Sequence, residues 1–312
     1  MTVAKERLKL AWRVAPATIS FILEVEAASR NARNLVDGLM LAAILAANVS
    51  AINNDPDLQI AYATLADAPP EDLRRPVSIS AIAHSMRMPF ETVRRRIQAM
   101  VRAGVLEVTP KGVLVASGVM RDPRFVGNAF VRHELLKAFY FEMKALGAAP
   151  VGSPGSYPSS RAPPLRLTNR LLFEYMLRAV DALSVAVGDA TNGVLLLAMV
   201  RRNTDGFESA EVAAWAQDPM NRGLPVRNGK LASELNLSTE TLRRYVIALE
   251  AKGFCMRGRL GLLATEPPGA RPALDRLVLG NLTNVQRLFG RLSQLGALSE
   301  WEAPERLASG AA

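Results

Sequence analysis

Residues 90–97 read Phe90-Glu91-Thr92-Val93-Arg94-Arg95-Arg96-Ile97, and this stretch decides the fold because residues 239–246 repeat it as Thr239-Glu240-Thr241-Leu242-Arg243-Arg244-Tyr245-Val246. In the first copy Val93, Ile97 and Met100 recur at the spacing of one face of an α-helix. Leu242, Val246 and Leu249 recur in the same way in the second copy. The spacing predicts two equivalent amphipathic helices, each with an apolar inner face and a charged outer face.

The sequence around each helix has the pattern of a helix-turn-helix followed by a β-hairpin. A short helical stretch precedes each copy, at residues 79–86 and 231–235, and leads into a tight turn. Ser238 is a favourable N-cap for the second helix, and Pro89 occupies the matching place in the first. After each helix comes a glycine that is expected to end it, and then two strand-like runs. These runs predict a two-stranded wing in each half.

The repeat extends over the whole of each half. Pro225-Val226 matches Pro76-Val77, 149 positions apart, and the apolar run at residues 37–45 returns at residues 192–200. Two further correspondences pair Trp215 with Tyr62, and Gly280-Asn281 with Gly127-Asn128 at the head of a closing helix. A repeat of about 150 residues indicates a domain duplication rather than a solenoid.

The predicted organisation is two modules joined by a linker. The first winged-helix module with helical arms takes residues 1–147, a Pro/Gly/Ser-rich linker residues 148–165, the second module residues 166–298, and a tail residues 299–312. Residues 1–15 are expected to be frayed. The other predicted helices span residues 17–30, 35–47, 58–65, 125–146, 171–187 and 272–294. The fold class is therefore mainly α with small β wings.

The two copies resemble the recognition helix of the catabolite-activator/anaerobic-regulator winged-helix family. The runs that carry the resemblance are P-F-E-T-V-R-R-R-I-Q-A-M-V-R-A-G-V-L and S-T-E-T-L-R-R-Y-V-I-A-L-E-A-K-G-F, within about 40 residues of each half. In that family a Glu and an Arg of this helix read base edges in the major groove. The resemblance assigns these roles to Glu91 with Arg95, and to Glu240 with Arg244. The family's cyclic-nucleotide barrel has no counterpart here, so the resemblance implies DNA binding and says nothing about a small-molecule effector.

The chemistry of the outer face is suited to reading duplex DNA. A guanidinium fork matches guanine O6 and N7, and a carboxylate accepts from cytosine N4. Hydroxyl groups and the remaining cations of the helices and wings suit phosphate oxygens. The predicted DNA-binding residues are Glu91, Thr92, Arg94, Arg95, Arg96, Gln98 and Lys111 in the first half, and Ser238, Thr239, Glu240, Thr241, Arg243, Arg244, Arg257 and Arg259 in the second.

An ordinary surface explanation competes with this interpretation. Glu91–Arg95 and Glu240–Arg244 have the spacing of i,i+4 ion pairs, which contribute about 0.3–0.5 kcal/mol on a solvated face. Their occurrence twice in the same register, between a helix-turn and a wing, favours DNA contact. The outer face of the second copy turns apolar at Ile247 and Ala251. The alternative function is therefore a protein-interaction adaptor that uses its winged helices without specific DNA readout.

Composition favours a globular protein with an acidic partner. The chain has 312 residues, a formal charge of +9 and a pI of about 10.1, which fits nucleic acid first and an anionic membrane second. The longest apolar run, residues 35–52, carries polar interruptions and is predicted to be a core helix rather than a membrane span. The single cysteine, Cys255, indicates a reducing compartment and is expected to be buried.

Catalytic and metal motifs are missing from the sequence. The only histidines, His84 and His133, together with one cysteine make no zinc site of known spacing. The aromatic run 139–141 is expected to lie in the core or an interface. We therefore expect a cytoplasmic, nucleoid-associated regulator of bacterial type that is not an enzyme and uses no metal or cofactor. Its expected partner is double-stranded DNA, bound by one chain as a pseudo-twofold pair of recognition helices or by a homodimer.

Overall fold

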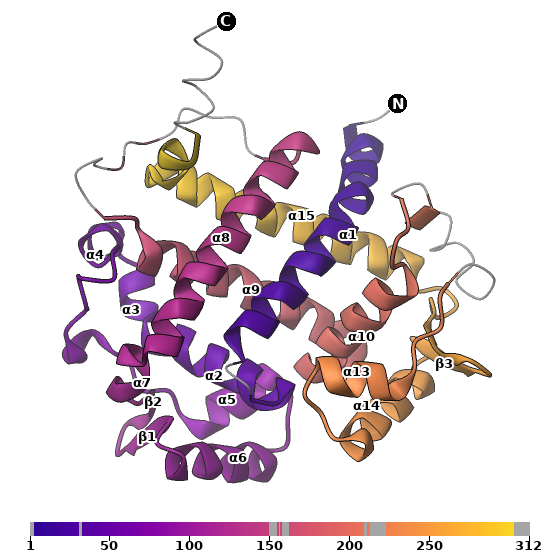
Figure 1. The fold of residues 1–312 in the computed structure, drawn as a ribbon, viewed down its shortest axis with the longest axis horizontal. Coiled ribbons are helices and arrows are strands. Elements are labelled where there is room, and N and C mark those ends of the chain that lie inside the picture. The colour runs from indigo at the N-terminus through magenta and orange to yellow at the C-terminus, as the bar shows by residue number, and fades with distance from the viewer. Residues whose placement is uncertain are drawn as a thin grey trace, which may run out of the picture.

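The computed structural model describes residues 3–30, 33–149, 155, 157, 162–208, 211–212 and 223–302. Within these ranges the chain is mainly helical, as predicted, and its strands form two antiparallel hairpins (Figure 1). Strand β1 (Leu106–Thr109) pairs with β2 (Gly112–Val115), and β3 (Cys255–Gly258) pairs with β4 (Gly261–Ala264). The two hairpins lie at equivalent points of two similar halves.

The helices of the first half precede and follow the first hairpin. They are α1 (Val3–Ser29), α2 (Leu35–Asn48), α3 (Ser50–Asn53), α4 (Pro56–Ala61), the 3-10 turn η1 (Glu71–Leu73), α5 (Ile79–Met86), α6 (Phe90–Arg102), α7 (Ser117–Arg121) and α8 (Pro123–Ala145). The second half repeats the main elements as α9 (Leu165–Val187), α10 (Ala190–Asn203), α13 (Asn228–Glu234), α14 (Thr239–Ala251) and α15 (Arg271–Gln294).

The turn between the two short helices has the same backbone in both halves. Arg87 and Asn236 adopt left-handed conformations, with φ of 54° and 49°. The amide that follows each of them bonds back to the first helix of its pair: Met88 N–H to the Ala83 carbonyl at 3.0 Å, and the Leu237 N–H to the corresponding carbonyl at 2.9 Å. A short helix, a turn of this backbone geometry, a longer helix and a hairpin therefore follow one another in both halves.

Each hairpin receives a third, very short extended segment. Val77 bridges Val113 in the first half, and Val226 bridges Leu262 in the second. This close approach explains the glycine at the head of β2 and β4. Gly112 has a φ of +135°, and a Cβ there would lie 2.7 Å from the Val77 carbonyl oxygen. Only a residue without a side chain fits between the two backbones.

The core is shared by the long helices of both halves. Helix α1 packs on α8 of its own half and on α15 of the other, while α9 packs on α15 and on α8. Such reciprocal contacts are those of a twofold interface, here within one chain. Phe21, Phe139, Tyr175 and Phe289 bring these four helices together, and the rings of Phe21 and Phe139 stack at 4.0 Å. Phe139 and Tyr140 are buried, which confirms the core assignment of that aromatic run.

Helix α1 is longer than predicted. Residues 3–15 are helical and the helix continues through Pro16, whereas the sequence suggested a frayed terminus. The reason lies in long-range contacts: Ala11 and Val14 are buried, and the Trp12 indole N–H donates to the Asp275 carboxylate at 2.8 Å. These contacts hold the first turns of α1 against α15, which local sequence cannot reveal.

The register of the closing helices also differs from the prediction. Gly147 and Gly296 both follow the last turn of their helix with positive φ, at the spacing that separates Pro76 from Pro225. Gly280-Asn281 therefore does not correspond to Gly127-Asn128; on this spacing Asn281 corresponds to Arg132. The earlier pairing rested on a chance dipeptide.

The linker and the tail are only partly described. Helix α9 begins at Leu165, earlier than predicted, because the amides of Arg166 and Leu167 bond to the Ala63 carbonyl at 2.8 and 3.1 Å. Residues 297–302 are helical and bury Trp301, where a tail was expected. Residues 150–154, 156 and 158–161 of the predicted linker, Trp215, and residues 303–312 of the tail lie outside the described residues.

In the described ranges no single helix is long and apolar enough to cross a membrane, while α9 and α10 meet that test by length and composition only as a pair bent by 93°.

Candidate nucleic-acid interface

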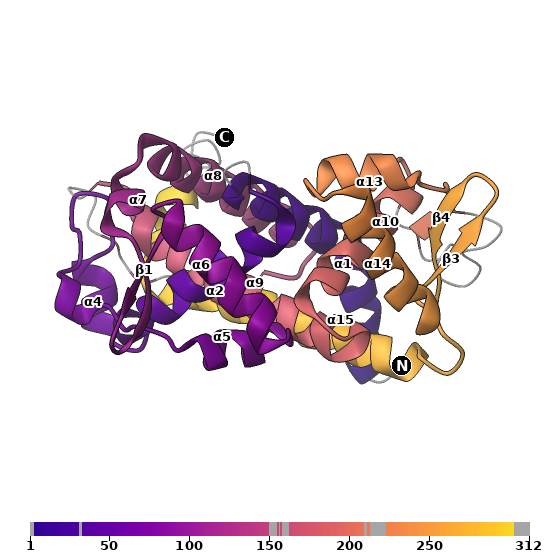
Figure 2. The same cartoon turned by 90° about the horizontal axis from the view of Figure 1, so that it is seen from below.

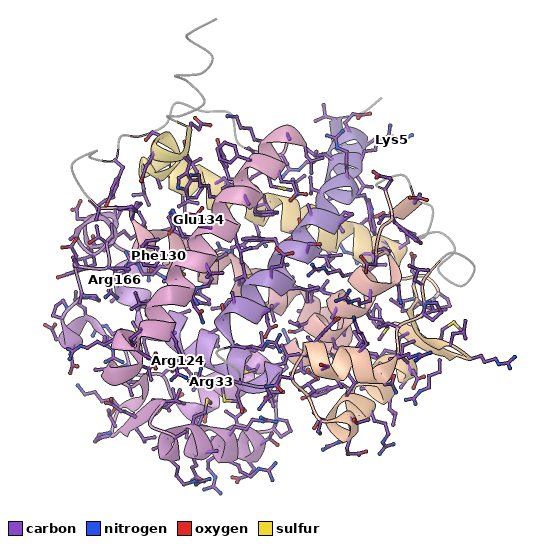
Figure 3. All side chains as sticks on the ribbon, viewed as in Figure 1. Lys5, Arg33, Arg124, Phe130, Glu134 and Arg166 are labelled. Carbon is purple, nitrogen blue, oxygen red and sulfur yellow. The ribbon has the colours of Figure 1, made fainter. Side chains whose placement is uncertain are left out.

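Helix α6 has the two faces that its sequence predicted. Val93, Ile97 and Met100 are buried. The exposed residues include Phe90 at the start of the helix and a polar row formed by Glu91, Arg94, Arg95, Gln98 and Arg102. In Figure 3, nitrogen-tipped side chains project from the lower surface of this helix, away from the core. The outer face of α6 is therefore available to a partner.

Helix α14 repeats this arrangement with a stronger cap. Leu242, Val246 and Leu249 are buried. The Ser238 hydroxyl accepts the Thr241 N–H at 3.1 Å and lies 2.8 Å from the Thr241 hydroxyl, so both side chains belong to the N-cap. The exposed residues of this face are Thr239, Glu240, Arg243, Arg244 and Ile247, and Ala251 at its end.

The ion pairs on both helices use i,i+3 partners rather than the expected i,i+4 partners. Arg94 bonds to Glu91 at 2.8 Å, and Arg243 bonds to Glu240 at 2.8 Å. The hydrogen bond from Arg243 holds the pKa of Glu240 below its usual value. The ordinary explanation, in which Arg95 or Arg244 pairs with its glutamate, is therefore not the arrangement seen.

Arg95 and Arg244 are consequently left with exposed guanidinium groups. Neither makes an ion pair or a side-chain hydrogen bond with any described residue. Arg94 takes only the Oε2 atom of Glu91, whereas Arg243 takes both carboxylate oxygens of Glu240. The first copy thus keeps one carboxylate oxygen and one guanidinium for an external partner, and the second keeps the guanidinium alone.

Arg96 does not lie on the outer face. Its Nη1 bonds to the Asp37 carboxylate at 2.7 Å, and both side chains are about a quarter exposed. This pair ties α6 to the start of α2. The sequence analysis assigned Arg96 to a phosphate contact, whereas in the structure its guanidinium pairs with Asp37. Thr92, also on the flank, is half-buried.

The hairpins carry the remaining predicted cations. Lys111 is exposed at the β1–β2 turn. In the second hairpin Arg259 is exposed, while Arg257 bonds to Glu250 of α14 at 2.8 Å and so braces the hairpin against the helix. Each hairpin also exposes a large apolar residue, Val108 at 59% and Leu260 at 72%.

One asparagine in each half fixes the hairpin to the apolar helix, and sequence reasoning did not find it. The Asn48 amide, at the end of α2, donates to the Arg75 and Val113 carbonyls at 2.8 and 3.1 Å and accepts the Val115 N–H at 2.9 Å. Asn203, at the end of α10, makes the same three bonds to its own hairpin and to the Leu224 carbonyl. A polar residue at the same place in two apolar helices was the available signal.

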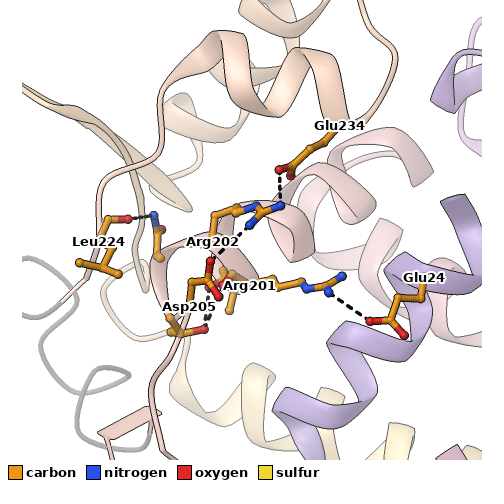
Figure 4. Close-up of polar contacts among 9 residues, drawn as sticks. Glu24, Arg201, Arg202, Asp205, Leu224 and Glu234 are labelled. Carbon is orange, nitrogen blue, oxygen red and sulfur yellow. Dashed lines mark hydrogen bonds and ion pairs between the residues drawn. The ribbon is translucent and has the colours of Figure 1, made fainter. Parts of the chain in front are cut away.

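Ion pairs lock the second half into position (Figure 4). Arg201 reaches Glu24 of α1 at 3.1 Å, and Arg202 bonds to Asp205 at 3.3 Å and to Glu234 at the end of α13. Arg30 in turn donates to the Glu234 carbonyl at 2.6 Å. These contacts connect α10 and α13 to the N-terminal helix of the other half, so the position of α14 is set by the shared core.

The two exposed helices lie on one side of the molecule. Helices α6 and α14 form its lower edge in Figure 1 and face the viewer in Figure 2, with one hairpin at each outer side. Both polar faces are exposed and neither is covered by another element among the described residues. The two similar charged helix faces are therefore exposed on the same side of the molecule.

The other sequence-based expectations concern the two histidines, the cysteine and metal binding. His84 is exposed; His133 is buried, and its Nδ1 lies 3.0 Å from the Thr168 hydroxyl. Cys255 is buried, as expected, and burial raises the pKa of its thiol to about 12. Within the described ranges no group of three or more metal-ligating side chains comes together.

Comparison with known proteins gives no relative: no family model, no curated protein and no solved structure matches the chain.

Proposed function

We propose that the chain is a sequence-specific double-stranded DNA-binding transcriptional regulator built from two tandem winged helix-turn-helix modules. The observation that carries this proposal is the pair of exposed, unpaired arginines, Arg95 and Arg244, at the same position of two equivalent helices on one side of the molecule. A recognition helix of this kind enters the major groove with its outer face toward the base edges.

The first copy is the better base reader. The Arg95 guanidinium offers two parallel N–H groups that match O6 and N7 of guanine. The free Oε1 of Glu91 is an acceptor for the N4 amino group of a neighbouring cytosine. In the second copy both oxygens of Glu240 are engaged by Arg243, so Arg244 alone supplies base recognition there.

Phosphate contacts supply the affinity. Lys111 and Arg259 project from the hairpin turns, and Thr239 and the first amides of α14 lie where a helix N-terminus attracts an anion. The net charge of +9 adds long-range attraction. Such contacts are independent of sequence and weaken steeply as salt rises.

One chain imitates the dimer that most such regulators form. The reciprocal packing of the long helices relates the two halves in the manner of a twofold axis, and α6 and α14 lie on the same side of it. We therefore propose that one chain binds an imperfect palindrome, and that the protein acts in the cytoplasm as a binding protein without enzymatic activity. Sedimentation of the complex on such a site gives one chain per duplex; two chains would indicate a homodimer with four modules.

The test is selection of binding sites from a random duplex library, followed by anisotropy titrations at about 0.15 M salt. Arg95→Ala is expected to cost about 1–3 kcal/mol and to relax the preference at one G·C position, whereas Lys111→Ala weakens all sequences alike. Lys5→Ala is the matched control, because Lys5 lies at the far end of α1 from α6 (Figure 3) and should change nothing. Unchanged specific binding by the Arg95 variant would contradict the base-reading role.

A protein-interaction adaptor is the second candidate, and one observation favours it. The second half exposes Ile247 at 45% on α14 and Leu260 at 72% on its hairpin. Apolar residues on that face suit a protein partner better than a phosphate backbone. The selection experiment separates the two functions, because an adaptor enriches no sequence and binds all duplexes weakly.

A further inference from the structure

A small cavity between the C-terminal end of α2 and helices α7, α8 and α9 is lined by three arginines. Its volume is about 70 Å³. The apolar part of the wall includes Leu45, Val49, Met120, Phe125, Val126 and Leu165. Arg132, Arg166 and Arg170 supply the charge, and no carboxylate is among the lining residues. A cavity with several cations and no anion is unusual, because buried charges are normally paired.

Two of these arginines donate hydrogen bonds to backbone carbonyls of α4 and of the loop that follows it. Arg170 donates to the Tyr62 carbonyl at 2.8 Å and to the Gln59 carbonyl at 3.0 Å. Arg166 donates to the Leu65 carbonyl at 3.2 Å. These hydrogen bonds hold the loop in place, and the two guanidinium groups also place positive potential at the cavity wall. Figure 3 shows Arg166 beside α8, on the side away from α14.

Arg132, the third arginine, donates no hydrogen bond to a backbone carbonyl of the described residues. Its side chain is almost fully buried, with the residue 2% exposed. Its Nε donates to Asn169 at 2.6 Å, and its guanidinium carbon lies 5.7 and 5.2 Å from the ring centres of Phe125 and Phe173. Its two terminal amino groups meet no hydrogen-bond acceptor among the described residues. Burial lowers the pKa of Arg132 to about 10, with no carboxylate nearby to oppose the change.

We propose that this cavity binds a short-chain monocarboxylate, with the carboxylate on the terminal amino groups of Arg132 and the hydrocarbon chain against the apolar wall. The guanidinium fork and a carboxylate match in a bidentate pair. The volume holds roughly five water-sized groups, which limits the ligand to about four or five carbons. Butyrate is the probe of this class.

The cavity on the opposite side of the pseudo-twofold arrangement shows that the fold does not require these charges. A cavity of about 180 Å³ lies between α1, α9, α10 and α15. At the position equivalent to Arg132 it has Asn281, whose amide oxygen accepts the Tyr175 hydroxyl at 3.1 Å. The buried arginine is therefore a property of the first half, beyond what packing of the shared architecture demands.

The cavity is connected to the first hairpin through two adjacent residues. Val49 lines the cavity and follows Asn48, the residue that holds β2. We expect butyrate to change the affinity of the protein for its selected duplex. This consequence rests on the proposed DNA-binding function, whereas the binding of the carboxylate does not.

The experiment is isothermal titration calorimetry of the full chain with butyrate, with butyramide as its neutral isostere and inorganic phosphate as a compact anion. We expect millimolar or tighter binding of butyrate, because a ligand of about six heavy atoms reaches that range. Butyramide and phosphate should bind at least about tenfold more weakly, since the first lacks the charge and the second the chain. Equal binding of all three, or of phosphate alone, overturns the proposal, as does the absence of butyrate binding.

Two variants and a control complete the test. Arg132→Met removes the charge and should abolish butyrate binding, while Arg132→Lys keeps the charge, loses the fork and should bind about tenfold more weakly. Arg124→Met, an exposed arginine near the start of the same helix, should bind as the wild type does. If Arg132→Met does not fold, Arg132→Lys decides, and butyrate affinity unchanged in it overturns the proposal. Calorimetry needs no DNA, so failure here is distinct from failure of the proposed function.

Discussion

Replacing Asn48 by alanine should remove about 2–3 kcal/mol from the free energy of unfolding. The side chain makes three hydrogen bonds and is 1% exposed. The Val113 carbonyl keeps a second bond from the Val77 N–H, so it is not left unpaired. The Val115 N–H loses its partner in the interior, at about 1–3 kcal/mol, and the bond to the Arg75 carbonyl contributes about 1 kcal/mol. Alanine has a higher helix propensity than asparagine, which offsets about 0.5 kcal/mol of this loss in the free energy of unfolding.

Urea denaturation followed by circular dichroism measures this loss. Asn203→Ala should give a loss of the same size, because its bonds have lengths of 2.7, 3.1 and 2.7 Å. Asn54→Ala is the control; Asn54 is exposed, and its replacement should change stability by less than about 0.5 kcal/mol. Amide exchange at Val115 should accelerate in the Asn48 variant. Losses at Asn48 and Asn203 no larger than that of the control would refute the reasoning.

Three further predictions use the same measurement. Arg96→Ala should lower the free energy of unfolding by about 1 kcal/mol. A double-mutant cycle with Asp37→Ala should show a coupling energy of about 0.5 kcal/mol or more. Additive effects would mean that the ion pair does not hold α6 against α2. Burial raises the pKa of Glu26 from 4.5 to about 7, so the folded state holds a proton that the unfolded state releases, and stability should fall as pH rises from 4.5 to 7. Glu26→Gln should remove that slope, and a slope that persists would contradict the assignment. Gly112→Ala and Gly261→Ala should each cost about 2 kcal/mol or more, because the added Cβ meets backbone; a neutral result would show that the hairpin relaxes.

The elements set by local sequence were predicted well. The apolar spacing of Val93, Ile97 and Met100 predicted the inner face of α6. Gly104 and Gly253, the glycines that follow α6 and α14, predicted where the hairpins begin. These features depend on residues a few positions apart, so the helical period and turn chemistry suffice. The correspondence of the two halves added an independent check, because each local pattern appeared twice.

Features set by distant contacts were missed. The direction of Arg96 depends on Asp37, which is remote in sequence. The helical start of α1 depends on contacts with α15, which is remote in sequence. Arg132 was not singled out from the sequence, because its environment is assembled by α9. Sequence periodicity gives the face of a helix but not the partner that a long side chain selects.

Because the two halves belong to one polypeptide, their sequences can differ from each other. In a homodimer every substitution is made twice, at both ends of the axis, whereas here the position of Arg132 can change while that of Asn281 stays neutral. The same freedom separates Glu91 from Glu240, whose carboxylates are engaged to different extents. A single gene can thus evolve an asymmetric pair, one member responsive and the other constant, without disturbing the helices that join them.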